Sequence, residues 1–337
     1  MVVGAYKHLR DEDKLTFLIE HLSSEAITTS EIEGEHLSRD SVQSSFRRHF
    51  GLATDHRRVK PAEDGIAEMM VDLYQNFSQT LSHELLFQWH KMLMSGRRDL
   101  DDIGRYRTHA DPMRVVSGAI AAPNIHFEAP PSKLVQKEME KFVSWYNHTA
   151  PTGSSPLPAL TRASIVHLYF VCVHPFEDGN GRIGRALAEK SLAQSLGQPT
   201  LMALSETILK HRKEYYATLE QNNKSLQIDG WIKYFSQTIL TGQKHTLAIM
   251  EFVIQKTKFF DRYKDNLNSR QVKVVQRIFQ EGPEGFKGGL SAENYISNTK
   301  TSRATATRDL ADLVDLGAMI RTGVGKGTRY YLKLVQN

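Results

Sequence analysis

The densest group of chemically useful residues lies between His174 and Arg185, in the sequence HPFEDGNGRIGR. This stretch combines a histidine, carboxylates and a glycine-rich bend with two arginines, Arg182 and Arg185, where a helix is predicted to begin. Glycines leave backbone N–H groups unobstructed, and a helix N-terminus adds unpaired donors and a favourable dipole. The bend is therefore predicted to bind an anion such as phosphate, with both arginines contacting further phosphate oxygens. Asp178 could hold a Mg²⁺ ion shared with those phosphates.

Two other nucleotide-binding patterns occur in the sequence. Residues 179–184 satisfy the dinucleotide-binding pattern G-x-G-x-x-G, with Glu206 at about the distance of a ribose-binding acid. That fold needs several alternating strands and helices, which a mostly helical chain lacks. Residues 323–328 resemble a phosphate-binding loop, but the lysine is followed by glycine and the first glycine is misplaced. A hairpin tip is the better interpretation of that segment.

A metal site can also be considered at His167, Cys172 and His174. These residues lie in an apolar run without a proper tetrahedral spacing, so core packing is the better account of His167 and Cys172. Cys172 is the single cysteine, which excludes an intrachain disulfide and a cysteine-rich zinc site and fits a reducing compartment.

The elements that must position these residues are predicted to be mainly α-helical. Helices are expected within residues 11–50, with Ser23 and Ser24 as N-cap candidates, and over residues 66–77, 83–94, 133–146, 183–196, 209–221, 230–241 and 244–261. Residues 104–131 place Gly, Pro and β-branched residues at turn and strand spacing, which predicts a short hairpin. The apolar run 163–173 fits a buried helix or a buried strand, and periodicity alone does not choose.

A separate pattern begins near Asn268. Helices are expected at residues 271–279, 291–296 and 302–316, followed by two short strands around a glycine-rich loop, which is the order of a winged-helix module. With 337 residues, more than one domain is expected. The predicted division is an N-terminal helical region (1–60), a core (61–243), and a linker helix with the winged-helix module (244–337).

The composition is that of an ordinary globular protein. With 40% hydrophobic and 24% charged residues, it excludes disorder, collagen and coiled-coil fibres. The formal charge is +5, and residues 270–337 carry all of this excess, with eleven basic and six acidic residues. We find no apolar run of signal-peptide or membrane-spanning length, so a soluble, cytoplasmic protein without a membrane partner is expected.

The string from His174 to Arg185 resembles, without a mismatch, the signature of the Fic family, His-x-Phe-x-Asp/Glu-Gly-Asn-Gly-Arg-x-x-Arg. The sequence GRYR at residues 104–107 and the segment from Tyr215 to Asn223 also look like Fic features, as does a hairpin formed by Val115, Val116, Ser117 and Gly118. The resemblance covers roughly residues 15–240. It implies a mainly α-helical Fic core with a small β-hairpin flap, and a helix over residues 163–173.

The resemblance implies transfer of AMP from ATP to a Ser, Thr or Tyr hydroxyl of a target protein, the chain itself included. His174 would be the general base for the attacking hydroxyl, and Phe176 would pack in the core. Asp178 would ligate a Mg²⁺ ion bridging the α- and β-phosphates. The phosphate contacts would come from Gly179, Asn180 and Gly181 as an anion hole, from Arg182 to the outgoing phosphates, and from Arg185 to the γ-phosphate.

Further roles follow from the same resemblance. Gly181 favours nucleotidyl over phosphoryl transfer, since family members with lysine there bind ATP reversed and act as kinases. The edge formed by residues 115–118 would align the target by strand addition. Tyr215 and Asn223 would line the adenine and ribose pocket.

The sequence TSEIEG, from Thr29 to Gly34, resembles the inhibitory motif Ser/Thr-x-x-x-Glu-Gly/Asn of some Fic proteins. Thr29 and Glu33 share one helix face, and a Glu33 carboxylate paired with Arg185 would occupy the place of the γ-phosphate. We therefore expect an autoinhibited enzyme that Glu33→Gly releases. In some relatives this glutamate positions a water that removes AMP, so a de-AMPylating hydrolase is an alternative.

The C-terminal module offers a competing class of function. Residues 303–310 resemble the recognition helices of winged-helix regulators, and DNA binding needs basic residues at that helix start and on the wing. Such residues are Arg303, Arg308, Arg321, Lys326 and Arg329. Against this, the rest of the helix is acidic, with Asp309, Asp312 and Asp315. Winged helices also serve as protein-docking or dimer modules, so DNA and a second copy of the chain are both candidate partners.

Overall fold

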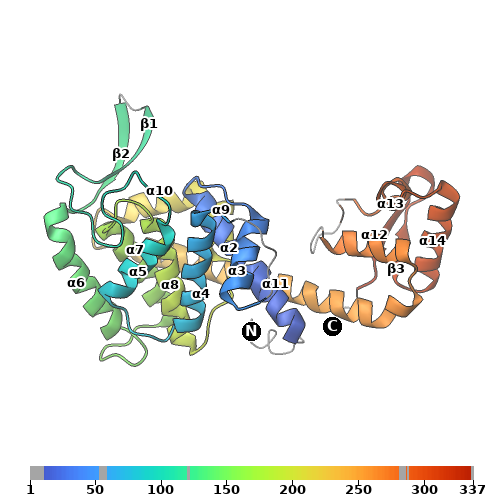
Figure 1. Cartoon of the computed structure of the whole chain (residues 1–337), viewed down its shortest axis with the longest axis horizontal. Coiled ribbons are helices and arrows are strands. Elements are labelled where there is room, and N and C mark those ends of the chain that lie inside the picture. Colours follow the sequence, from blue (N-terminus) through green and yellow to red (C-terminus); the bar gives the residue numbers. More distant parts are fainter. Residues whose placement is uncertain (1–10, 53–58, 120–121, 281–285, 287, 335–337) are drawn as a thin grey trace. The chain divides into compact units, whose positions relative to one another are not determined.

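The computed structural model describes residues 11–52, 59–119, 122–280, 286 and 288–334 (Figure 1). This part of the chain is mainly helical, with thirteen α-helices and two antiparallel β-hairpins. It forms two compact units, one spanning Leu15–His245 and the other built mainly from residue 246 onward. Among these residues, no helix combines the length and the apolar character needed to cross a bilayer.

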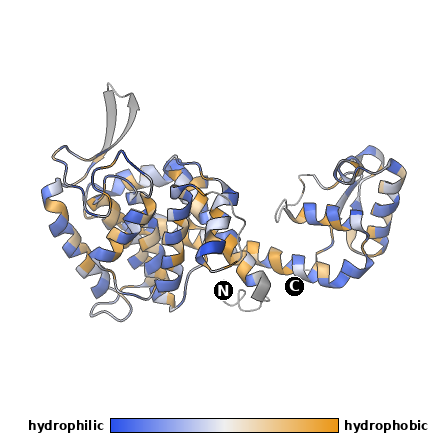
Figure 2. Ribbon diagram, in the orientation of Figure 1, coloured by the Kyte–Doolittle hydropathy of each residue, from blue (hydrophilic) through white to orange (hydrophobic). Residues whose placement is uncertain are grey.

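The first unit is a bundle of helices around a buried apolar core. Figure 2 shows the apolar segments gathered where these helices face one another. Its helices are α2 (Asp11–Ile32), α3 (Arg39–His49), α4 (Pro61–Asn76), α5 (His83–Leu93), α6 (Ser132–His148), α7 (Ala159–Val173), α8 (Asn180–Leu196), α9 (Leu204–Lys210), α10 (Arg212–Asn222) and the first part of α11 (Asp229–Tyr263).

Helices α7 and α8 pack against each other at the centre of this unit. Nearly every α8 residue from Asn180 to Ala193 is buried, which explains why neither helix shows a clean polar face in the sequence. The run 163–173 is thus a helix, as the family resemblance implies. His167 of α7 is fully buried, stacks against the rings of Trp231 and Phe235, and hydrogen-bonds the Tyr215 hydroxyl at 2.7 Å, so its core role is confirmed.

Three sequence-based helix boundaries were wrong. Helix α2 runs without a break through Ser23 and Ser24, so these serines do not cap a second helix. The segment predicted as one helix over residues 209–221 is divided at His211 between α9 and α10. Conversely, α11 is continuous over Asp229–Tyr263 and includes both predicted helices, 230–241 and 244–261.

The predicted hairpin consists of β1 (Arg114–Ala119) and β2 (Ala122–Glu128). The strands are antiparallel, with Val116 opposite Ile125 and Gly118 opposite Pro123, and the register shifts between Val115 and Val116. Residues 115–118 are therefore extended, as expected for the flap, whereas their role in aligning a target stays a prediction.

The second unit contains α12 (Ser269–Gln280), α13 (Ala292–Thr299), α14 (Arg303–Asp315) and the hairpin of β3 (Met319–Thr322) with β4 (Arg329–Leu332). A short 3-10 helix, Lys264–Asn266, precedes α12, and an isolated bridge joins Leu290 to Tyr330. Tyr295, Leu310 and Leu313 form part of its own buried core. Residues 323–328 form the tip of the hairpin, which confirms that interpretation over a phosphate-binding loop.

Candidate active site

His174 lies at the junction of α7 and the loop that leads into α8. The helix ends at Val173, and His174 adopts the left-handed conformation with φ 51° and ψ 58°. A non-glycine residue in this region costs about 1–3 kcal/mol unless its surroundings hold it there. Here the His174 N–H donates to the Phe170 carbonyl at 3.0 Å, and its own carbonyl accepts from Arg107 Nε at 2.8 Å. The loop thus begins with a fixed turn.

The protonation state of His174 follows from its contacts. Its Nδ1 lies 3.2 Å from the Val171 carbonyl oxygen, which can only accept, so Nδ1 carries the proton and Nε2 has a free lone pair. Burial lowers the pKa of His174 to about 4, so the ring is neutral at pH 7. A neutral imidazole with a free Nε2 can act as a general base.

Arg107 supports the loop in a way that sequence reasoning missed. Its side chain is buried and donates to the His174 carbonyl, the Pro130 carbonyl and the Ser132 hydroxyl, while its N–H donates to the Pro175 carbonyl. The GRYR pattern marked the residue, but its sequence neighbours gave no sign that its partners would be backbone carbonyls.

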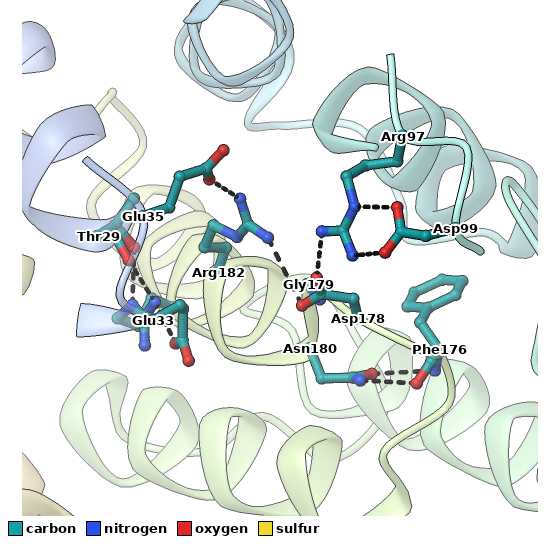
Figure 3. Close-up of polar contacts among 11 residues, drawn as sticks. Thr29, Glu33, Glu35, Arg97, Asp99, Phe176, Asp178, Gly179, Asn180 and Arg182 are labelled. Carbon is teal, nitrogen blue, oxygen red and sulfur yellow. Dashed lines mark hydrogen bonds and ion pairs between the residues drawn. The ribbon is translucent and has the colours of Figure 1, made fainter. Parts of the chain in front are cut away.

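The middle of the loop is fixed by Phe176 and Asn180 (Figure 3). The Phe176 N–H donates to Asn180 Oδ1 at 3.0 Å, and Asn180 Nδ2 donates to the Phe176 carbonyl at 2.8 Å. The Phe176 ring is fully buried, as predicted, and stacks on His90 with 4.1 Å between ring centroids. Asn180 therefore braces the loop rather than pointing into open space.

Asp178 is surrounded by positive charge. Its Oδ2 accepts a hydrogen bond from Arg97 Nη1 at 2.7 Å, and its Oδ1 lies 3.6 Å from Arg182 Nη2 (Figure 3). Burial alone would raise the pKa of this carboxyl group, but Arg182 and Arg97 outweigh it and lower the pKa below its usual value. Arg97 also forms a two-point ion pair with Asp99. Asp178 is therefore an ionised carboxylate already paired with cations.

The two arginines of the motif lie one turn apart on α8, which begins after Gly179 with φ 80°. Arg185 Nη2 donates to Glu33 Oε1 at 2.7 Å, and Nε and Nη2 donate to the hydroxyl and carbonyl of Thr29 at 2.7 and 2.9 Å. The ion pair expected between Glu33 and Arg185 is thus present. Arg182 Nη1 donates to Glu35 Oε2 at 2.7 Å, a contact that sequence reasoning missed.

Both arginines keep unused donors. Arg182 is 5% exposed and Arg185 is 3% exposed. Arg182 Nε and Arg185 Nη1 are buried and have no hydrogen-bond partner among the described residues. Unsatisfied buried donors are costly, so these groups are suited to bind an anion that the protein itself does not supply.

The end of the Glu33 side chain occupies the space beside Gly181. A Cβ at Gly181 would overlap Glu33 Oε1 and would lie 3.2 Å from Arg185 Nη1. The Glu33 carboxylate therefore lies against the start of α8, where the unpaired N–H groups of the helix end favour an anion.

A cavity of about 600 Å³ opens beside this helix start. Glu33, His174, Gly181, Tyr215 and Asn223 all line it, which brings together residues predicted from distant parts of the sequence. The Asn223 Oδ1 atom is buried and has no hydrogen-bond partner in the described structure, so it can accept from a ligand.

The cavity wall also contains residues that sequence reasoning did not assign to it. Cys172 packs against the buried core, as predicted, but it is partly exposed and also lines the cavity, because it lies close to the end of α7. Arg212 and Tyr216 line it as well, with the guanidinium carbon 5.7 Å from the ring centroid. Glu206 does not line this cavity, and it pairs instead with Lys210 and His245.

Comparison with known proteins places this site in a family. Residues 80–192 match the Fic/DOC family, and residues 1–52 match DUF4172, described as a domain of unknown function. Residues 80–192 are therefore similar to a Fic/DOC family domain. The match to Fic/DOC includes His174, the whole loop and both arginines of α8.

The chain is also a distant homologue of protein adenylyltransferases. It is 34% identical to protein adenylyltransferase fic-1 of Caenorhabditis elegans, over 50% of this chain and 29% of that protein. It is 29% identical to fic-1 of Caenorhabditis briggsae, over 54% of this chain and 35% of that protein. The chain therefore matches only about a third of the length of these curated relatives.

Solved structures share the Fic fold. A Fic family protein from Desulfovibrio desulfuricans aligns with 100% of this chain and 94% of its own, with a TM-score of 0.55 and 19% identity. A fragment of Fic-1 from C. elegans aligns with 74% of this chain and 70% of its own, with a TM-score of 0.51 and 22% identity. The predicted mainly helical Fic fold is confirmed.

Proposed function

We propose that this Fic chain is a protein adenylyltransferase, which transfers AMP from ATP to a hydroxyl group of a target protein. One arrangement carries the proposal: His174, neutral and with a free Nε2, lines the same cavity as Gly181 at the start of α8. A base beside a phosphate-binding helix end is what hydroxyl attack on phosphorus requires. Homology to nematode adenylyltransferases supports the same reaction.

In the proposed reaction, the target hydroxyl oxygen attacks the α-phosphorus while His174 Nε2 accepts the hydroxyl proton. The bond from the α-phosphorus to its bridging oxygen breaks, and pyrophosphate leaves with the bonding electrons. Arg182 and Arg185 would hold the leaving phosphates through their unsatisfied donors. Backbone N–H groups around Gly179 and Gly181 would stabilise the charge that develops at the α-phosphate.

Asp178 fits a Mg²⁺ site shared with the nucleotide. Its carboxylate is ionised, and its surroundings already hold cationic groups close to both oxygens. Mg²⁺ commonly binds one or two carboxylates together with substrate phosphates and water. The described residues contain no group of three His, Cys, Asp or Glu side chains able to hold a metal, so phosphate and water oxygens would complete the shell. The ion would neutralise phosphate charge, and Arg97 would have to release Asp178.

Autoinhibition by Glu33 is part of this proposal. The carboxylate pairs with Arg185 and lies against Gly181, where the γ-phosphate contacts would otherwise form. An anion in that place competes directly with the nucleotide. The unsubstituted chain should therefore incorporate AMP weakly.

Labelled ATP tests the reaction class. A Glu33→Gly form is incubated with a cell lysate as the source of target and with ATP labelled at either the α- or the γ-phosphate. We expect the α-label to enter protein and the γ-label not to, with His174→Ala in the same background abolishing incorporation. Incorporation of the γ-label would instead indicate a kinase, and no incorporation of either label would show that the proposal is wrong.

A de-AMPylating hydrolase is the second candidate for this site. It is favoured by the position of Glu33, which lines the same cavity as His174 and could orient a water molecule there. Under this alternative, the unsubstituted chain should release AMP from a protein that the Glu33→Gly form has modified. Glu33→Gln should abolish that release, whereas autoinhibition alone predicts no release by any form.

DNA binding is a candidate function of the C-terminal unit, separate from the reaction at the cavity. We propose that this unit is a winged helix, because α13 and α14 are joined by three residues, with Lys300 in the left-handed conformation, and are followed by a hairpin. Asp309 does not expose its charge on α14: it is buried and bonded to Arg270 at 2.7 and 3.0 Å. Asp309 therefore does not add to the exposed negative charge of α14, which weakens the argument against DNA binding by this helix.

A salt-dependent mobility-shift assay with duplex DNA and the full chain tests this candidate. Arg308 is exposed in the first half of α14, the part of a recognition helix that reaches base edges. Arg308→Ala should weaken binding by about tenfold, since one basic contact is worth about 1–3 kcal/mol. Lys273→Ala removes the same charge from the exposed surface of α12 and should have little effect. Equal losses, or no binding in low salt, would rule out recognition through α14.

A further inference from the structure

The segment 33–35 carries two carboxylates, and each pairs with a different arginine of α8. Glu33 Oε1 lies 2.7 Å from Arg185 Nη2, and Glu35 Oε2 lies 2.7 Å from Arg182 Nη1. Figure 3 shows the two glutamates reaching the start of α8 from the same segment. The inhibitory sequence pattern accounts for the first of these pairs, and nothing in that pattern assigns a role to Glu35.

Gly34 makes the double contact possible. Helix α2 ends at Ile32, and the N–H groups of Glu33 and Glu35 both donate to the Ser30 carbonyl at 3.0 Å. This closure requires Gly34 to adopt a φ of 85°, which glycine reaches without strain. The chain therefore turns back at the helix end, and the carboxylates on either side of the glycine reach arginines one helical turn apart.

Glu35 neutralises the positive charge of Arg182, which has few other partners among the described residues. Arg182 is 5% exposed, its Nη2 is 3.6 Å from Asp178, and its Nε has no partner among the described residues. The contact with Glu35 is the shorter of its two ion pairs, and it is a charge-assisted hydrogen bond. The Glu35 side chain is 36% exposed, so it can move into solvent when another anion takes its place.

We propose that Glu35 competes with the nucleotide for Arg182, so that Glu33 and Glu35 form a two-carboxylate lock on the phosphate site. Glu33 opposes the γ-phosphate at Arg185, and Glu35 opposes the inner phosphates at Arg182. This inference rests on the proposed function for the assignment of the arginines. Because ADP lacks the phosphate against which Glu33 competes, Glu35 should weaken the binding of both ADP and ATP, whereas Glu33 should weaken mainly the binding of ATP.

Nucleotide affinity tests this lock without any turnover. Dissociation constants for ADP and ATP with Mg²⁺ are measured by calorimetry on full-length chains that all carry His174→Ala. Glu35→Gln should tighten ADP and ATP by about tenfold each, the gain expected when one charge-assisted competitor is lost. Glu33→Gln should tighten ATP by a similar factor and change ADP by less than about twofold.

Glu31→Gln is the matched control, because it removes a carboxylate from the same helix end and Glu31 contacts neither arginine by hydrogen bond or ion pair. It should change neither affinity. Glu35→Asp keeps the charge with a shorter side chain and should give an intermediate ADP affinity. Equal melting temperatures of these variants would exclude misfolding as the cause.

The outcomes separate this inference from the proposed function. ADP affinity that is the same with and without Glu35→Gln would overturn the role of Glu35 and leave adenylyl transfer standing. If the affinities follow the predicted pattern but the Glu33→Gly form transfers no AMP, the proposed transferase activity is overturned and the lock is not. Failure of every variant to bind either nucleotide would overturn both.

Discussion

Replacing Glu33 with glycine should lower the stability of the nucleotide-free chain and raise AMP incorporation at the same time. Arg185 is 3% exposed and the Glu33 side chain is 28% exposed, so the substitution leaves a buried guanidinium without its carboxylate. Removing one partner of a fully buried pair costs about 3–5 kcal/mol. The partial exposure of Glu33 and the two remaining bonds from Arg185 to Thr29 reduce this to about 1–2 kcal/mol.

The gain in activity follows from the same contact. A hydrogen bond to a charged group contributes about 1.5–3 kcal/mol, and each 1.36 kcal/mol corresponds to a factor of ten. Loss of the competitor at Arg185 should therefore raise incorporation by about 10–100-fold at ATP concentrations below saturation. Glu35 would still occupy Arg182, so adding Glu35→Gln should raise incorporation further.

The assay combines incorporation of α-labelled ATP with thermal unfolding in the presence and absence of ATP. Glu33→Gln separates the loss of charge from the added backbone freedom of glycine and should behave like Glu33→Gly in both measurements. Lower stability with unchanged incorporation would mean that the pair is structural only. Unchanged values in both measurements would mean that Glu33 does not pair with Arg185 in solution, which would refute the reasoning.

Three further predictions concern other parts of the molecule. Arg107→Ala should lower the melting temperature and reduce incorporation at least tenfold, because it removes the side-chain donors that fix the loop beginning at His174; unchanged incorporation would contradict this. Glu189→Gln should raise the melting temperature more at pH 8 than at pH 5. Burial raises the pKa of Glu189 from 4.5 to about 8, so its contribution to stability is lost as the pH rises across that interval, and equal gains at both pH values would argue against it. Asp309→Asn should destabilise the second unit by about 2–3 kcal/mol, seen by calorimetry, and leave incorporation unchanged, since the Arg270 ion pair lies within that unit.

The loop from His174 to Gly179 could be predicted from the sequence because its contacts are local. Asn180 hydrogen-bonds the backbone of Phe176, four residues earlier. Helix α8, which starts directly after the loop, places both arginines in its first two turns. Helix geometry and glycine conformations are enough to bring such residues together. The ion pair of Glu33 with Arg185 was also accessible, because the inhibitory motif and the phosphate-binding motif are both recognisable as strings.

The remaining contacts could not be predicted, because they join residues that approach each other only in the folded chain. Glu35 is 147 residues from Arg182 in the sequence, and Arg97 is 81 residues from Asp178. No periodicity or spacing pairs side chains over such distances. The same reason explains Cys172, since an apolar run shows that a helix is buried but not which residue meets a cavity.

These long-range pairs share one physical cause. A site built to hold a triphosphate gathers positive charge, and in the absence of nucleotide that charge would be buried with insufficient compensation. In this chain Glu33, Glu35 and Asp178 lie against the arginines of the site, so the contacts that would inhibit nucleotide binding in the proposed function also stabilise the chain without nucleotide. The same ion pairs would then both inhibit nucleotide binding and stabilise the chain without nucleotide. Any substitution that opens the site should therefore lower the stability of the free chain, and added nucleotide should restore it by occupying the vacated donors.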